Sequence, residues 1–238
     1  DLAARCRHSL ALGTQGDAAV QEATRRHWRP STDGATPAPG LQASPTDDID
    51  VSCQRSEHGF QVSVRAADQV GLLATVAAVL ALHRLQVRQA DVATEGEVAW
   101  QVWEVTPLFG DPPQAPALAE DIRRAVRGTY DAASVLAHRS ASNAARPGWL
   151  PDPVVTIESS PSGARVLEVR AHDAPALLHA IASTIATCGA SIGGAKVDTL
   201  GSEVIDVFFL TGPDGGPLPD DVAETVRRRV LDRLLSIP

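Results

Sequence analysis

The feature that most constrains the fold of this 238-residue chain is an internal repeat. Residues 165–211 align without a gap on residues 60–106 after a constant shift of 105 positions, which places Asp173 on Asp68. Other identical pairs are Arg65 and Arg170, Val92 and Val197, Gly96 and Gly201, and Thr106 and Thr211. Identities this regular indicate two copies of one structural unit. Two copies are too few for a solenoid, so we expect paired domains.

Each copy follows the same order of expected elements. A strand with alternating apolar residues leads through Asp68 or Asp173, at a position suited to a helix cap, into a stretch with helical spacing of apolar residues. Two strands joined at a glycine turn follow, and a charged amphipathic helix ends the copy. One more strand-like segment precedes each copy. The expected elements are residues 49–53, 61–65, 70–83, 86–94, 98–106 and 118–130, then 154–158, 166–170, 175–188, 191–200, 203–211 and 220–235.

This ββαββα order predicts an α+β fold class with two ferredoxin-like domains. Each domain is expected to have a four-stranded antiparallel sheet with two helices on one face, its first strand pairing as an edge hairpin with the next. We expect the domains at residues 49–135 and 154–238, with a linker at 136–153. Residues 2–12 and 17–28 could form short helices, and residues 29–48 are expected to be a linker rich in Pro and Ser, because their composition cannot support a core.

Composition excludes several classes of protein. The chain contains no methionine and begins at Asp1, so we expect a processed product or a fragment of a longer protein. A net charge of −8 argues against a nucleic-acid partner. Three widely spaced cysteines, Cys6, Cys53 and Cys188, lack metal or redox spacing and suggest reduced thiols in the cytoplasm. No apolar stretch has the length of a membrane span, so no membrane partner is expected.

The turn into the first helix carries a family resemblance. Asp68-Gln69-Val70-Gly71-Leu72-Leu73, and more loosely residues 173–178, resemble the ACT domain, a module that senses small molecules. The wider pattern of residues 49–238 resembles the C-terminal tandem of ACT domains in bacterial PII uridylyltransferase/uridylyl-removing enzymes of the actinobacterial type. Residues 166–214, with Ala-Lys-Val after the helix and Asp-Val-Phe-Phe-Leu-Thr in the last strand, carry this resemblance most clearly.

The resemblance implies a regulatory region that senses glutamine as a signal of nitrogen status. In the family, a nucleotidyltransferase domain transfers UMP or AMP to the PII signal protein, and an HD-type hydrolase domain reverses the modification. No motif of either domain occurs in this chain, so we expect no catalytic residue and no cofactor here, while the parent enzyme is expected to use Mg²⁺. The resemblance also implies that residues 1–48 are the helical tail of an upstream domain plus its linker, and that ACT units pair within or between chains.

A physical argument places the ligand at the turn before each first helix. The first backbone N–H groups of a helix are unpaired and can bind an amino-acid carboxylate, and glycine lets a ligand approach them closely. Gly71 meets this requirement, and Asp68 is available for the ligand ammonium. The candidate ligand-binding residues are Asp68, Gln69, Val70, Gly71, Leu72, Gln86, Asp173, Ala174, Ala176 and Leu177.

The two copies differ at this turn. The Ala176 methyl group replaces Gly71 and is expected to crowd a ligand in the second copy. Many ACT domains that bind amino acids have an asparagine at the start of the next strand, where this chain has Gln86 and Ser191. The alternative reading is that Gly71 only allows close packing and that Asp68 and Asp173 only cap helices.

Other readings remain open from the sequence. The His172-Asp173 pair lacks the further ligands of a metal site, so no metal is expected. A purely interacting ACT module that dimerises without a ligand is one alternative function. An effector-binding domain of an amino-acid biosynthetic enzyme is another.

Overall fold

The computed structural model describes residues 49–56, 59–109, 114–139, 151–160 and 164–237. The helical tail expected in residues 1–48 lies outside the described residues. The first unit contains β1 (Asp50–Ser56), β2 (Gly59–Ala67), α3 (Leu72–Leu82), β3 (Leu85–Glu95), β4 (Val98–Pro107), α4 (Ala115–Val126) and α5 (Ala132–Arg139). The second contains β5 (Val154–Ser159), β6 (Arg165–His172), α6 (Leu177–Thr187), β7 (Ser191–Leu200), β8 (Glu203–Thr211) and α7 (Asp220–Leu235).

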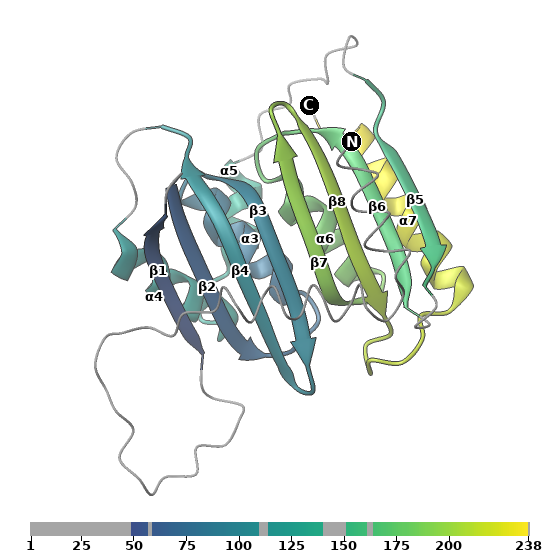
Figure 1. The fold of residues 1–238 in the computed structure, drawn as a ribbon, viewed down its shortest axis with the longest axis horizontal. Helices are drawn as coiled ribbons and strands as arrows, with labels where there is room; N and C mark the ends of the chain where they lie inside the picture. The colour runs from purple at the N-terminus through teal and green to yellow at the C-terminus, as the bar shows by residue number, and fades with distance from the viewer. Residues whose placement is uncertain (1–48, 57–58, 110–113, 140–150, 161–163, 238) are drawn as a thin grey trace, which may run out of the picture.

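All eight strands form one antiparallel sheet in the order β1-β2-β4-β3-β7-β8-β6-β5. The helices lie behind this sheet, on one of its faces (Figure 1). The hairpins β1–β2 and β5–β6 take the outer edges, as the repeat predicts. The α+β fold class with two ferredoxin-like units is therefore confirmed.

The alternation of β2 shows how the sequence builds the core. Phe60, Val62 and Val64 are buried in the apolar core between the sheet and the helices. In β4 the buried Trp103 pairs with Val62 and fills the same layer. Apolar side chains from both units belong to one continuous core, so the units share their packing as well as their sheet.

The two units meet at strands β3 and β7, and the repeat makes this contact symmetric. Asp91 and Lys196 occupy the same position in their respective copies, 105 residues apart, and are also partners in the β3–β7 register. A pseudo-two-fold axis therefore passes between them. Lys196 Nζ lies 3.2 Å from Asp91 Oδ1. If two β3 strands paired in this register, Asp91 would face Asp91, and if two β7 strands paired, Lys196 would face Lys196. The ion pair therefore favours pairing of β3 with β7.

Two sequence-based expectations about the helix starts are wrong. The helices begin at Leu72 and Leu177, two residues later than expected, and their N-cap residues are Gly71 and Ala176. Neither helix has a side-chain hydrogen bond at its cap. The expectation that the two aspartates cap the helices fails because each lies three residues before the N-cap.

The end of the first unit also differs from the expectation. Helix α4 stops at Val126 because Gly128 has a left-handed backbone with φ of 72°, so the expected helix through Tyr130 is interrupted. The additional helix α5 spans the expected start of the linker at residue 136 and packs Ala132 and Leu136 into the core. Asp131 begins α5 and accepts hydrogen bonds from the backbone N–H and hydroxyl of Ser134, which lower the pKa of its carboxyl. No helix among the described residues is both long and apolar enough to cross a membrane.

Candidate functional site

The start of α6 has the features of an anion-binding helix terminus. Ala176, the N-cap residue, has φ of 61°, a left-handed conformation that few residues other than glycine adopt. The first regular helical bond runs from the N–H of Ala180 to the carbonyl of Ala176. Because no side chain caps this end, backbone N–H groups of the first turn are available to a ligand.

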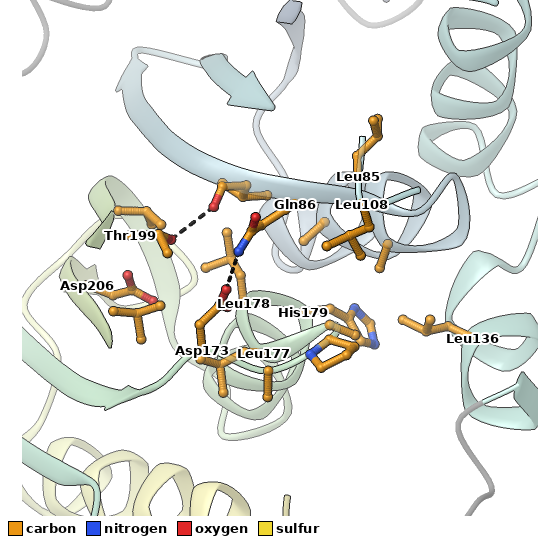
Figure 2. A pocket seen from close by; sticks show the side chains of 18 residues that line it. Leu85, Gln86, Leu108, Leu136, Asp173, Leu177, Leu178, His179, Thr199 and Asp206 are labelled. Atoms are coloured by element: carbon orange, nitrogen blue, oxygen red, sulfur yellow. Dashed lines mark hydrogen bonds between the residues drawn. The ribbon is translucent and has the colours of Figure 1, made fainter. Parts of the chain in front are cut away.

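This helix start faces the first unit across a cavity of about 170 Å³, here named the interface cavity. Its walls come from α3, the start of β3 and α5 of the first unit, and from the turn before α6, α6, β7 and β8 of the second (Figure 2). The lining residues are Ala77, Ala81, Leu85, Gln86, Val87, Leu108, Leu136, Asp173, Ala174, Pro175, Ala176, Leu177, Leu178, His179, Val197, Thr199, Val204 and Asp206. Mostly apolar walls with a few polar groups are typical of small-molecule sites.

Two hydrogen bonds cross the cavity between the units. Gln86 Nε2 of β3 donates to Asp173 Oδ2 at 2.5 Å, and Thr199 Oγ1 of β7 donates to the carbonyl of Val87 at 2.9 Å (Figure 2). Both tie the start of β3 to the second unit. A ligand in the cavity would therefore contact both units at once.

Asp206 is the most deeply buried charged group of the cavity lining. It lies in the middle of β8, is 1% exposed, and its Oδ1 has no hydrogen-bond partner in the part of the chain that the structure describes. Burial raises the pKa of this carboxyl well above its usual value, and the negative charges of Asp173 and Asp198 raise it further. The side chain therefore holds a proton more strongly than an exposed aspartate does.

The repeat places a second, much smaller cavity at the start of α3. This small cavity has a volume of about 10 Å³. It is lined by Asp68, Gln69, Gly71, Leu72, Leu73, Val92, Ala99, Gln101, Ala186, Ala190 and Ile192. Every one of these residues has its repeat counterpart in the lining of the interface cavity. Gln101, the counterpart of Asp206, is likewise 1% exposed with an unpartnered Oε1.

The structure divides the candidate residues between the two cavities. It brings Gln86 together with four candidates of the other copy, namely Asp173, Ala174, Ala176 and Leu177. Asp68, Gln69, Gly71 and Leu72 lie at the small cavity instead. Val70 lines neither cavity and is 43% exposed. Burial raises the pKa of the Asp68 carboxyl.

Several lining residues were missed by the sequence analysis. Thr199, His179 and Leu136 come from elements whose contact with the turn depends on how the units pair. Asp206 had a local signal, because it is the one charged residue in the apolar run from Val204 to Leu210. A carboxyl in a strand that is otherwise fully apolar marks a buried polar group.

The described residues contain no group of three or more His, Cys, Asp or Glu side chains that could hold a metal ion. His172 ends strand β6, and Asp173 follows it at the cavity.

Comparisons with known proteins identify relatives of the chain. No family model matches it. It is 40% identical over 185 residues to the bifunctional uridylyltransferase/uridylyl-removing enzyme of Streptomyces coelicolor, an alignment that covers 74% of this chain and 22% of the relative. It is 32% identical over 229 residues to the enzyme of that name from Mycobacterium tuberculosis, covering 90% of this chain and 26% of the relative. The enzyme of Caulobacter vibrioides is 32% identical over 67% of this chain and 18% of its own length.

Among solved structures, an aspartate kinase from Synechocystis aligns with a TM-score of 0.37 and 13% identity, over 74% of this chain and 27% of the kinase. The sequence relatives agree with one another in name, and the chain spans between 18% and 26% of their length. The chain thus belongs, as the homologue of one region, to the family of bifunctional uridylyltransferase/uridylyl-removing enzymes.

Proposed function

We propose that this chain is the regulatory region of a cytoplasmic uridylyltransferase/uridylyl-removing enzyme and that it binds glutamine in the interface cavity. The catalytic work of such an enzyme, transfer of UMP or AMP to the PII protein with Mg²⁺ and hydrolytic removal, belongs to other parts of the protein. The chain's own contribution is to report the concentration of the amino acid.

The interface cavity is the observation that carries the proposal. Its chemistry is complementary to a free α-amino acid: the N-terminus of α6 suits the carboxylate, and the Asp173 carboxylate suits the ammonium. A volume of about 170 Å³ is adequate for a small amino acid, whereas one of about 10 Å³ holds little more than a water molecule.

The position of the cavity supplies a physical basis for regulation. Its walls belong to both units, so a bound ligand stabilises the arrangement of units that fits it best. A ligand shifts a conformational equilibrium only by its difference in affinity between the two states. Glutamine would therefore act on the enzyme through the relative placement of the two ferredoxin-like units.

Isothermal titration calorimetry of the chain with glutamine tests this proposal. We expect saturable binding with one glutamine per chain, and much weaker binding of branched-chain and aromatic amino acids. The test protein must show a cooperative thermal unfolding transition in the same buffer. A folded chain that gives no binding heat at millimolar glutamine would rule out direct sensing by this region.

A second candidate function is a module that assembles without a ligand. It is favoured by the direct β3–β7 pairing, in which the Asp91–Lys196 ion pair needs no ligand. Sedimentation of the chain with and without glutamine separates the two: association that is independent of glutamine and unchanged by Gly71→Val favours the assembly function.

A further inference from the structure

The buried polar residue at the inner wall of the interface cavity carries an inference about selectivity, which rests on the proposed function. We propose that the Asp206 carboxyl is the specificity-determining group of the interface cavity and selects an amino acid with a carboxamide side chain over its carboxylate counterpart.

The placement of Asp206 supports this role. The residue lies on β8, while the groups suited to the ammonium and carboxylate of the ligand lie at the turn before α6. Figure 2 shows Asp206 beside Thr199, with Leu178 and Asp173 close by. Around it the lining is apolar, from Val197, Val204 and Leu178. A ligand anchored at the helix start would extend its side chain along these walls toward Asp206.

The unpartnered oxygen is the second observation. Oδ1 of Asp206 is buried without a hydrogen-bond partner among the described residues. Leaving such a group unpaired costs about 1–3 kcal/mol, and more when it is charged. A ligand that supplies the missing partner therefore recovers free energy.

The charge state decides which ligand group fits. Burial raises the pKa of Asp206, so the neutral acid is favoured and offers one O–H donor beside a carbonyl acceptor. A primary carboxamide offers the complementary N–H donor and carbonyl acceptor, and the two groups form a pair of hydrogen bonds. A ligand carboxylate can accept the Asp206 O–H, but it has no donor for the Asp206 carbonyl oxygen and it adds a negative charge near Asp173 and Asp198. Like charges brought together in this way cost several kcal/mol.

The other titratable groups around Asp206 do not reverse this argument. Asp173 approaches from the turn before α6 and Asp198 from β7, and both are acidic. His179 of α6 also lines the cavity, but its Nδ1 lies 2.9 Å from the carbonyl of Ala74. Lys196 is engaged with Asp91. The cavity wall near Asp206 is therefore unfavourable for an added anion.

The test compares dissociation constants for glutamine, glutamate and glutamate γ-methyl ester, measured by calorimetry on the whole 238-residue chain. For the wild type we expect glutamate to bind at least about 100-fold more weakly than glutamine. The ester is neutral but lacks the N–H donors, so it should fall between them. Asp206→Asn keeps a neutral donor and acceptor at this position, so it should retain both glutamine binding and the preference. Asp206→Val removes both groups. It should bind glutamine at least about tenfold more weakly, because the carboxamide of the ligand is left unpaired, and it should lose much of the preference.

Asp198→Asn is the matched control. It removes a carboxyl from the adjacent strand, where the alternation of β7 directs the side chain away from the buried Val197 layer. Its glutamine-to-glutamate ratio should stay within about threefold of the wild type, since long-range charge effects near a surface are small. Thermal unfolding checks that the variants fold. If Asp206→Val does not fold, a wild type that lacks the preference still overturns the proposal.

Each outcome has one reading. A wild type that binds glutamate as tightly as glutamine overturns the selectivity proposal and leaves glutamine binding intact. Glutamine affinity that is unchanged in a folded Asp206→Val variant does the same. A folded wild type that binds none of the three ligands overturns the proposed function and this inference together.

Discussion

The two cavities of this molecule occupy equivalent places in two copies of one unit, yet only one of them has room for a ligand. The interface cavity at Asp173 has a volume of about 170 Å³ and the small cavity at Asp68 about 10 Å³. Gly71, which favours the first copy on sequence grounds, lies at the smaller of the two cavities. A glycine at the turn therefore does not determine the volume that is available to a ligand.

The side chains opposite the turn explain part of the difference. Gln101 in the small cavity is longer by one methylene than Asp206 in the interface cavity, and Ile192 is larger than its counterpart Val87. Ala99 and Ala190, in contrast, are smaller than Val204 and Leu85. The interface cavity also has walls from Leu108, Leu136 and His179, and no repeat counterpart of these residues lines the small cavity. The repeat can thus keep its backbone and form cavities of different volume at its two turns.

The largest effect that tests this comparison is expected for the two aspartates of the turns. Asp173→Asn removes the charge that faces the ligand ammonium, and a charge-assisted hydrogen bond contributes about 1.5–3 kcal/mol. We expect glutamine affinity to fall by about 10- to 100-fold in calorimetry. Asp68→Asn, the same change at the small cavity, should leave the affinity within about twofold, because no ligand is expected there.

If Asp68→Asn weakened binding as strongly as Asp173→Asn, the assignment of the ligand to a single cavity would be wrong. Two glutamines per chain in the wild type would lead to the same conclusion.

The sequence predicts the elements of each unit better than it predicts the interface between the units. The strands, their hairpins and the last helix at Asp220–Leu235 follow from alternation, helical spacing and the repeat, and the structure confirms them. Helix α5 was missed because only eight residues form it and two buried side chains, Ala132 and Leu136, anchor it. Such a short pattern is no stronger than that of a loop.

The candidate site required knowledge of the pairing between units. Gln86 and Asp173 were each identified as candidates, but in separate copies, and their hydrogen bond arises only when β3 pairs with β7. One local feature was informative in retrospect: Asp91 and Lys196, alike in position and opposite in charge, mark the strands that meet. Edge choice depends on long-range contacts that periodicity within one strand does not encode.

An effect of intermediate size is expected from the second difference between the cavities, Asp206 against Gln101. In the unfolded chain Asp206 ionises near its ordinary pKa of 3.8, whereas in the fold the pKa is raised by burial. The folded state therefore holds the proton more tightly, and the free energy of unfolding falls as pH rises from the unfolded to the folded pKa. Gln101 does not titrate and contributes no such dependence.

Asp206→Asn removes this pH-dependent loss. We expect the variant to be more stable than the wild type by about 2 kcal/mol at pH 8 and nearly equal to it at pH 4, by urea unfolding at both values. Asp198→Asn is the matched comparison. Burial raises the pKa of this carboxyl too, but the carboxyl is only half-buried and Lys196 opposes the shift, so its pH-dependent gain in stability should be smaller. A stability difference for Asp206→Asn that does not change with pH would show that the carboxyl is ionised in the fold.

The smallest expected effect concerns the helix starts themselves, Gly71 and Ala176. Both N-cap residues have a left-handed backbone, with φ of 88° and 61°. Alanine in this region costs roughly 1 kcal/mol relative to glycine. Ala176→Gly should therefore raise the free energy of unfolding by up to about 1 kcal/mol, and Gly71→Ala should lower it by a similar amount, in matched urea titrations. The nearest atom to the added methyl at Gly71 is 3.8 Å away, so backbone strain and not a clash sets the cost.

Glutamine affinity gives the same pair of variants a second reading. Ala176→Gly removes a methyl group from the wall of the interface cavity, while Gly71→Ala changes the cavity without a ligand. If the Ala176 methyl crowds the ligand, Ala176→Gly should bind glutamine more tightly than the wild type. The gain in stability cannot cause this change, because binding is measured on chains that are already folded. If the affinity is unchanged, the cavity accommodates the methyl group, and residue 176 affects only the stability of the helix start. In both cases Gly71→Ala should leave glutamine affinity unaltered, which separates the backbone requirement shared by the two copies from the binding role assigned to one.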